Sequence, residues 1–163
     1  MDQLSVEGLA RELGVTKGSF YWHFRDRSAL ISGALDLWER EDTIVIVESL
    51  QRIEDPKERL QALYDVSLGD VNDGPLDGAL AVRIDDPIVG PVVRRVTERR
   101  VAFLERLFRD LGLTPGRARI RARITYSAYV GHFQVVRAMP DDRDLSGPSA
   151  AYNRHLVSTF TAP

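Results

Sequence analysis

The chain has 163 residues, of which 44% are hydrophobic and 28% are charged, and its formal net charge is −2. This length fits one ordinary domain or a small module joined to a larger one, and the composition is typical of a protein with a buried core. The absence of cysteine excludes disulfides and thiolate metal sites. No apolar stretch approaches the roughly 20 residues of a membrane-spanning helix, and no leader is visible. We therefore expect a soluble, cytoplasmic protein that contacts no membrane.

The charges are distributed unevenly along the chain. Residues 1–27 are neutral, residues 28–93 carry five basic and fourteen acidic side chains, and residues 94–123 carry ten arginines and three acidic residues. A basic stripe can mark a nucleic-acid surface. These arginines recur through two helical segments, however, so we favour a solvated helix face that pairs with the acidic middle of the chain.

The first third of the chain has helical spacing and no sustained alternation of polar and apolar residues. A helix capped by Ser5 is expected to end at Gly14, which can adopt a left-handed conformation. Thr16 caps the next helix. Asp26 caps a third helix, which we expect to continue to about Ser49. The β-branched run "TIVIVES" within it could form a strand, but its continuity with the preceding helical pattern favours helix.

The sequence after about residue 50 also predicts helices. Asp55 is expected to cap one of them, and "VNDGPLDG", residues 71–78, is expected to be a loop with Gly74 and Pro75 as helix breakers. Further helices are expected at about 76–84, from "DDPIVGP" to "GLTPG", at 116–139 and at 149–161. The predicted fold class is all-α, with a short helical module at residues 1–49 joined without a flexible linker to a larger helical body at residues 50–163.

The stretch "TKGSFYWHF" carries the clearest functional pattern. Two helices separated by a tight turn, the second starting with small polar residues, are typical of a helix-turn-helix, whose second helix enters the major groove of DNA. Thr16 and Ser19 can hydrogen-bond phosphate or base, and Lys17 adds positive charge. Gly18 has no side chain where the backbone must approach the duplex closely.

The aromatic residues of this stretch fall on two sides of the predicted helix. Phe20 and Phe24 are four residues apart and share a face against which Leu9 and Leu13 can pack. The three remaining rings, Tyr21, Trp22 and His23, point elsewhere and have polar tips suited to phosphates and base edges. We expect the phenylalanines to belong to the core and these three rings to contact DNA.

The segment "SVEGLARELGVTKGSFYWHFRDRSALI" resembles the DNA-binding signature of the TetR family of bacterial transcriptional regulators. The resemblance implies operator contacts by Thr16, Lys17, Gly18, Ser19, Tyr21, Trp22 and His23. It also places Arg27 where the family usually has a phosphate-binding lysine, and an arginine keeps the charge and the donors.

The resemblance covers about a sixth of the chain, and one feature departs from the family. Members begin with a further helix, whereas only "MDQL" precedes the Ser5 cap. A start codon assigned too late, residues upstream of Met1 and a genuine truncation are the alternatives, and we favour the first two. A truncated chain is expected to have an unstable module and to bind its operator weakly.

For the body, the resemblance implies a small-molecule site and pairing of the last two long helices with those of a second subunit. The protein would then be a homodimeric repressor that a small-molecule ligand releases from operator DNA. The alternative is a dimeric small-molecule-binding protein that no longer binds DNA.

The helix expected at 116–139 has two unlike faces. We assign one face, together with two residues of the last helix, to the dimer interface: Ile120, Ile124, Ser127, Ala128, Gly131 and Val135, with Tyr152 and Leu156. The opposite face carries Tyr126, Tyr129 and Phe133, with Arg137 near its end. Together with Tyr64 from another helix, these residues form either ordinary core or a ligand pocket.

Catalytic patterns are missing from the sequence. The three histidines form no His-Glu helical pair of the zinc-hydrolase kind, and there is neither a Gly-x-Ser-x-Gly elbow nor a phosphate-binding loop. Pairs of aspartates occur only at expected helix starts or in loops, where capping explains them. We expect that the protein is not an enzyme and that it binds neither a metal ion nor a cofactor.

Overall fold

The computed structural model describes residues 6–12, 14, 16–68, 74–139, 141, 155, 158 and 159. Every element within these residues is helical, which confirms the predicted all-α class. A small head consists of α1 (Val6–Glu12) and α2 (Lys17–His23). A long connecting helix follows, made of α3 (Arg27–Glu39), the π-helical turn η1 (Arg40–Val45) and α4 (Ile46–Gln51). The bundle consists of α5 (Pro56–Leu68), α6 (Gly74–Ala81), α7 (Val89–Asp110) and α8 (Pro115–Ala138).

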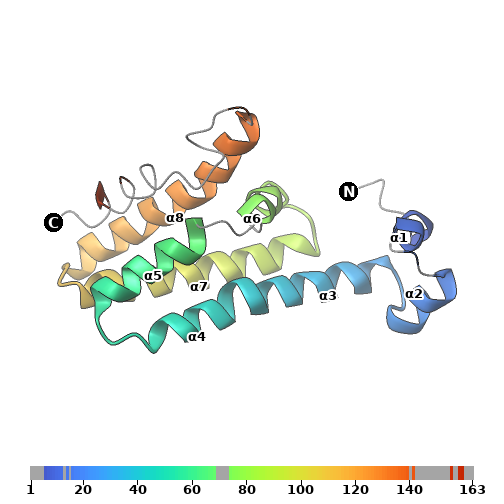
Figure 1. Ribbon diagram of the computed structural model, residues 1–163, viewed down its shortest axis with the longest axis horizontal. Coiled ribbons are helices and arrows are strands. Elements are labelled where there is room, and N and C mark those ends of the chain that lie inside the picture. The colour runs from blue at the N-terminus through green and yellow to red at the C-terminus, as the bar shows by residue number, and fades with distance from the viewer. Residues whose placement is uncertain are drawn as a thin grey trace.

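The head lies at one end of the molecule and is joined to the bundle through α3 (Figure 1). Gly14, with φ of +66°, turns the chain between α1 and α2. The hydroxyl of Thr16 accepts a hydrogen bond of 3.1 Å from the N–H of Ser19, which confirms the predicted cap of α2. Ser5, the cap expected for the first helix, lies outside the described residues.

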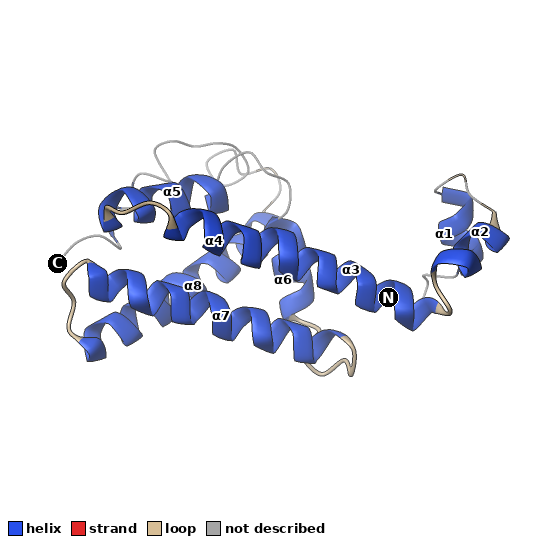
Figure 2. Cartoon of the chain, turned by 90° about the horizontal axis from the view of Figure 1, so that it is seen from below, coloured by secondary structure: helices blue, strands red, loops and turns tan. Residues whose placement is uncertain are grey.

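The connecting helix is continuous from the head to the far end of the bundle (Figure 2). Asp26 caps it by accepting a hydrogen bond of 2.8 Å from the N–H of Ala29, as predicted. The run "TIVIVES" is helical, as predicted, but the sequence did not indicate that Arg40–Val45 forms a π-helical turn. Whether a helix widens to the π form depends on its tertiary partners, and such turns are rare.

One local prediction is wrong. Residues 74–78 of the expected loop belong to α6, which begins at Gly74 and ends at Ala81 rather than near residue 84. Residues 71–73 lie outside the described residues. Glycine and proline interrupt the interior of a helix, but proline is accepted in the first turn because its missing N–H has no partner there. Asp55, in contrast, accepts a hydrogen bond of 3.1 Å from the N–H of Lys57 at the start of α5, as predicted.

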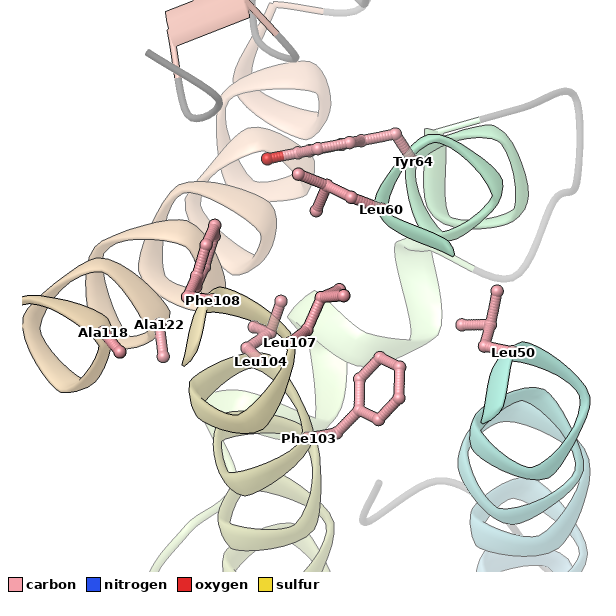
Figure 3. Close-up of a cluster of buried hydrophobic side chains, with 9 residues drawn as sticks. All are labelled: Leu50, Leu60, Tyr64, Phe103, Leu104, Leu107, Phe108, Ala118 and Ala122. Atoms are coloured by element: carbon pink, nitrogen blue, oxygen red, sulfur yellow. The ribbon is translucent and has the colours of Figure 1, made fainter. Parts of the chain in front are cut away.

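The largest core cluster lies where α4, α5, α7 and α8 meet (Figure 3). Leu60, Leu107 and Phe108 are about 1% exposed at its centre. Its buried members are Leu50, Leu60, Tyr64, Phe103, Leu104, Leu107, Phe108, Ala118 and Ala122. Burial at this depth removes apolar surface from water and stabilises the packing of these four helices.

A second core cluster attaches α3 to the bundle. Leu35 and Trp38 of α3 are buried with Leu80 of α6 and with four valines of α7: Val89, Val92, Val93 and Val96. Most of α3 beyond its first turns is therefore packed against the bundle. A movement within the bundle can reach the head through this helix.

The α7–α8 hairpin packs against the connecting helix through α7, and α8 lies on the far side of α7 (Figure 1). Gly112, with φ of +92°, ends α7, and the N–H of Leu113 donates a hydrogen bond of 3.1 Å to the carbonyl of Phe108. This pattern closes the end of a helix with a left-handed glycine. It confirms that "GLTPG" stops the long helix.

Candidate nucleic-acid interface and interior polar cluster

The α2 helix has one buried side and a broad exposed side. Phe20 is 6% exposed and packs edge-on against Tyr21, with 5.3 Å between ring centroids. Trp22 is 82% exposed and Tyr21 is 50% exposed. His23 is also exposed, and its ring lies edge-on to that of Trp22 at 4.6 Å. Because Phe20 anchors the helix from below, the other three rings face outward.

The start of α2 is polar and accessible. Thr16, Lys17 and Gly18 are exposed, and Ser19 is half-buried. A Cβ added at Gly18 would meet only the hydroxyl of Thr16, at 3.7 Å, so nothing inside the protomer requires glycine there. A hydroxyl, an ammonium and bare backbone at a helix start suit phosphate and base edges.

Phe24 follows α2 and is half-buried. Its ring lies 5.7 Å from that of Phe20, and it approaches α3 at Gly33. The two phenylalanines therefore lie on the inner side of the head, as expected. The side chains of Leu9 and Leu13, which were expected to cover the same face, lie outside the described part of the chain.

Arg27 is the first residue of α3 and is half-buried. Hydrogen bonds from the N–H groups of Val89 and Ile88 hold the pKa of Asp86 below its ordinary value, and the positive charge of Arg27 contributes. Arg27 therefore lies at the start of the connecting helix, close enough to the start of α7 for its charge to act on Asp86.

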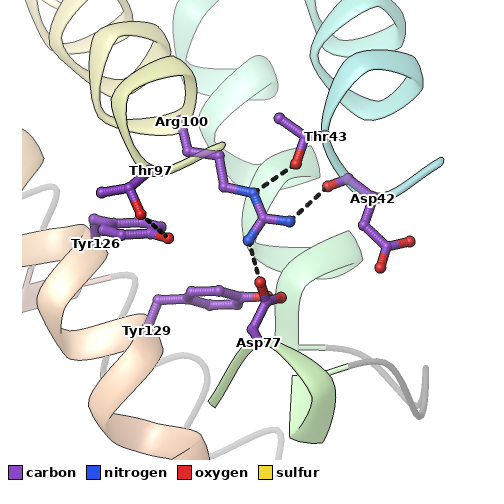
Figure 4. A network of polar contacts seen from close by, with 7 residues as sticks. All are labelled: Asp42, Thr43, Asp77, Thr97, Arg100, Tyr126 and Tyr129. Carbon is purple, nitrogen blue, oxygen red and sulfur yellow. Dashed lines mark hydrogen bonds and ion pairs between the residues drawn. The ribbon is translucent and has the colours of Figure 1, made fainter. Parts of the chain in front are cut away.

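Inside the bundle, a polar cluster surrounds the guanidinium of Arg100 on α7 (Figure 4). Its Nη1 donates a hydrogen bond of 2.7 Å to Asp77 of α6. Its Nε donates to the hydroxyl of Thr43 at 2.8 Å, and its Nη2 donates to the carbonyl of Asp42 at 3.0 Å. The guanidinium also lies over the rings of Trp38 and Tyr129, at 5.5 and 5.9 Å from their centroids. One side chain thus joins α6, α8 and the connecting helix.

The carboxylate of Asp77 is shared between Arg100 and Tyr129. The hydroxyl of Tyr129 on α8 donates to it at 2.7 Å. Burial, together with the adjacent carboxylate of Asp77, raises the pKa of Tyr129, so the phenol stays protonated and remains a donor. The side chains of Arg100 and Asp77 are 12% and 5% exposed. Two opposite charges at this depth are stable only as a pair.

Three of the five predicted pocket residues are neighbours along α8. Tyr126, Tyr129 and Phe133 follow one another along α8, with ring centroids 6.2 and 5.1 Å apart. Tyr126 shares a hydrogen bond of 3.2 Å with Thr97. Tyr64 belongs to the main core cluster, against which Tyr126 also packs, and burial raises its pKa to about 12. Arg137 is exposed in the last turn of α8. The structure brings three of the five predicted residues together.

Sequence reasoning missed Arg100, Asp77 and Thr43. Arg100 was counted with the basic stripe and expected on a solvated face. A signal was present, because Arg100 lies four residues after Val96 and four before Leu104 on the apolar side of α7. A charged residue in the middle of a helical apolar stripe indicates a buried partner.

The face of α8 assigned to subunit pairing is largely uncovered in the protomer. Ile120, Ile124 and Val135 are 61%, 53% and 45% exposed. Ala128 and Gly131 lie on the same face and are half-buried, and Ser127 is exposed. Tyr152 and Leu156, assigned to the same interface, lie outside the described residues.

No helix within the described ranges is both long enough and apolar enough to span a bilayer. Over the same ranges, no group of three or more histidine, cysteine or carboxylate side chains is arranged to hold a metal ion.

The fold and the exposed side of α2 define a helix-turn-helix protein with an all-helical body. Residues 1–34 match the family model described as "Bacterial regulatory proteins, tetR family". The structure resembles a crystal structure of a TetR transcriptional regulator from Legionella pneumophila, with a TM-score of 0.77 and 15% sequence identity over 97% of this chain and 87% of that chain. No curated protein sequence matches the chain. The match of the N-terminal segment and the shared fold together support the prediction, made from the sequence signature, that the protein is a transcriptional regulator of the TetR family.

Proposed function

We propose that this protein is a homodimeric transcriptional repressor that binds operator DNA through α2 and leaves it when a small-molecule effector binds in the bundle. The observation that carries the proposal is the arrangement of rings on α2. Trp22, Tyr21 and His23 are exposed, while Phe20 is buried beneath them. A surface tryptophan that is 82% exposed contributes little to the core, so contact with a partner is the better explanation.

Operator contact would use both ends of α2. Thr16, Lys17, Gly18 and Ser19 would meet phosphates and base edges at the helix start, and Tyr21, Trp22 and His23 would extend the contact along the groove. Arg27 would contact the phosphate backbone of the DNA beside these residues. Phosphate contacts position a protein on DNA, whereas contacts to base edges provide its sequence preference.

The dimer would form through α8. Exposed isoleucines and a valine flank the small residues Ala128 and Gly131, so the helix of a second copy could approach closely there and cover the apolar side chains. Ile120, Ile124 and Val135 would be the apolar contacts, with Tyr152 and Leu156 beside them. A two-fold axis at α8 would give the dimer two heads for two half-sites of an operator.

The effector would bind between α6, α7 and α8, beside Tyr126, Tyr129 and Phe133. Stacked rings with a few polar groups are typical of small-molecule sites. Arg100 and Asp77 add charge at this place, while Tyr64 and Arg137 would take part only at the margins.

The test begins with selection of duplexes from a random-sequence pool on the immobilised full chain. Fluorescence anisotropy of the recovered duplex then gives its affinity at several salt concentrations. We expect enrichment of a two-fold symmetric site and an affinity that falls linearly with the logarithm of salt concentration. Compounds that raise the melting temperature of the protein should release that duplex. Failure to enrich any duplex would instead favour a dimeric small-molecule-binding protein without DNA binding, an alternative suggested by the neutral charge of residues 1–27.

A further inference from the structure

We infer that Arg100 holds the π-helical turn η1 of the connecting helix in place, and that Asp77 and Tyr129 in turn hold Arg100. A change on the α6–α8 side would then alter the connecting helix through a single side chain. The inference rests on the proposed function, because it names the element through which an effector would act on the head.

The η1 turn has the properties of a hinge. It lies between Trp38, which is buried in the second core cluster, and Leu50, which is buried in the main one. Both sides of the turn are therefore anchored to the bundle by packing. A π-helical turn is less favourable than an α-helical one, and bends in long helices concentrate at such turns.

Arg100 contacts η1 at two places. It donates to the carbonyl of Asp42 and to the hydroxyl of Thr43, at 3.0 and 2.8 Å. Thr43 is 1% exposed, so water cannot reach its hydroxyl and take the place of Arg100 as its hydrogen-bond partner. These bonds favour the geometry of the π turn over competing geometries of the same residues.

The other side of Arg100 faces α6 and α8. Asp77 supplies its counter-charge and Tyr129 orients Asp77, each through a bond of 2.7 Å. A buried guanidinium that lost this carboxylate would have to reorient toward another acceptor or toward water. Its hydrogen bonds to η1 would be lost with that movement.

A second ion pair provides a fixed point beside the hinge. Arg95 of α7 binds the carboxylate of Glu39, the last residue of α3, through Nε and Nη2. None of these contacts involves α6 or α8. Release of Arg100 would therefore loosen η1 while Arg95 still fixed the last residue of α3 to α7. The bend would then lie within Arg40–Val45, and α3 with the head would tilt about Glu39.

The decisive experiment is amide hydrogen exchange on the full chain, without DNA, for Tyr129→Phe. This variant removes only the hydroxyl that orients Asp77, and Tyr129 forms no hydrogen bond with η1. We expect the amides of residues 42–47 to exchange about 3- to 10-fold faster than in the wild type. The variant loses the hydrogen bond from Tyr129 to Asp77, which supports the hydrogen-bonded, exchange-protected form of η1. Thr43→Val, which removes an acceptor of Arg100 directly, should have the same effect.

Tyr126→Phe is the matched control. It removes a hydroxyl from the same helix, but that hydroxyl bonds Thr97 and not Asp77 or Arg100. Exchange in η1 should change less than 2-fold. Should Tyr129→Phe fail to fold, Asp77→Asn carries the same expectation.

A second measurement reports the position of the head. The chain has no cysteine, so spin labels can be attached at Glu12→Cys on α1 and Glu58→Cys on α5, both exposed positions. Dilution with unlabelled chain restricts the measured distance to one protomer. The distance distribution should broaden or shift with Tyr129→Phe and stay unchanged with Tyr126→Phe.

Unchanged exchange in η1 for both Tyr129→Phe and Thr43→Val would overturn the inference, and so would an equal response to Tyr126→Phe. Neither measurement uses DNA, so the result is independent of whether the protein is a repressor. A protein that binds its selected duplex but shows no such response would keep the proposed function and lose this mechanism.

Discussion

Arg95 of α7 binds both carboxylate oxygens of Glu39, the last residue of α3, with Nε at 2.9 and 3.0 Å from them. The side chain of Glu39 is 8% exposed, whereas that of Arg95 is 48% exposed. The pair therefore attaches the connecting helix to α7 with one partner inside the protein and the other partly in solvent. This arrangement makes the contribution of Glu39 to stability dependent on pH.

The hydrogen bonds and the charge of Arg95 hold the pKa of Glu39 below its ordinary value of 4.5. Because the pKa is lower in the folded state, the stabilisation is complete above about pH 5 and is lost as the pH falls through the folded-state pKa. Glu39→Gln should lower the free energy of unfolding by about 1–2 kcal/mol at pH 7. The difference from the wild type should shrink below about pH 4.5.

Urea unfolding at pH 7 and at lower pH measures this difference. Glu41→Gln is the control, because Glu41 is exposed and its ion pair with Arg40 spans 3.8 Å. It should change stability by less than about 0.5 kcal/mol. A Glu39→Gln effect that stayed constant over the acid range would contradict the pH argument.

Trp22→Ala should weaken binding of the selected duplex about 10-fold or more, since contacts to base edges are worth about 1–3 kcal/mol. The melting temperature should stay nearly unchanged because the side chain is 82% exposed. Leu37→Ala, an exposed position on α3 away from the proposed interface, should change neither quantity. Equal affinity of the wild type and Trp22→Ala would argue against α2 as the recognition helix.

Lys17→Ala should reduce the slope of log affinity against log salt by about 1, because one phosphate contact is lost. The chain offers a matched control, since Lys57 is its one other lysine and lies on α5. Lys57→Ala should leave the slope unchanged. Titrations at four or more salt concentrations are needed, and a slope that responds equally to both variants would refute the placement of Lys17 on the backbone.

Gly90→Ala should lower stability by about 1–3 kcal/mol, in the range of other overpacked interior sites. A Cβ at Gly90, on the buried side of α7, would collide with the carbonyl oxygen of Ile84. At Gly116 on α8 a Cβ would meet nothing within 4 Å. Gly116→Ala should therefore raise stability by a few tenths of a kcal/mol up to about 1. Thermal denaturation of the two variants measures this contrast in sign.

Ile124→Glu should convert the proposed dimer into monomers, because it places a charge in the apolar face of α8 that a second subunit would cover. Leu37→Glu is the control, since Leu37 is 60% exposed but lies on α3. Analytical ultracentrifugation of both variants gives their masses. A wild-type chain that sediments as a monomer, or an Ile124→Glu chain that remains dimeric, would remove α8 as the interface.

Features set by neighbouring residues could be predicted well. The caps at Thr16 and Asp26 form as expected, because a side-chain oxygen needs only the N–H three residues ahead. The sorting of Phe20 from Trp22 follows from helical periodicity alone. The error at Gly74 has a local origin too, because proline and glycine break the interior of a helix but are tolerated at its start.

The sequence by itself therefore determined the all-helical class, the helix-turn-helix and the surface that α2 exposes, since each depends on hydrogen bonds or spacing within a few residues. Only the tertiary structure decided that Arg100 is buried and that Arg40–Val45 forms a π turn. Arg100 meets Asp77 across 23 residues and Thr43 across 57. Contacts over such separations arise when helices pack, and the free energy of burying a charge depends on which partners that packing supplies.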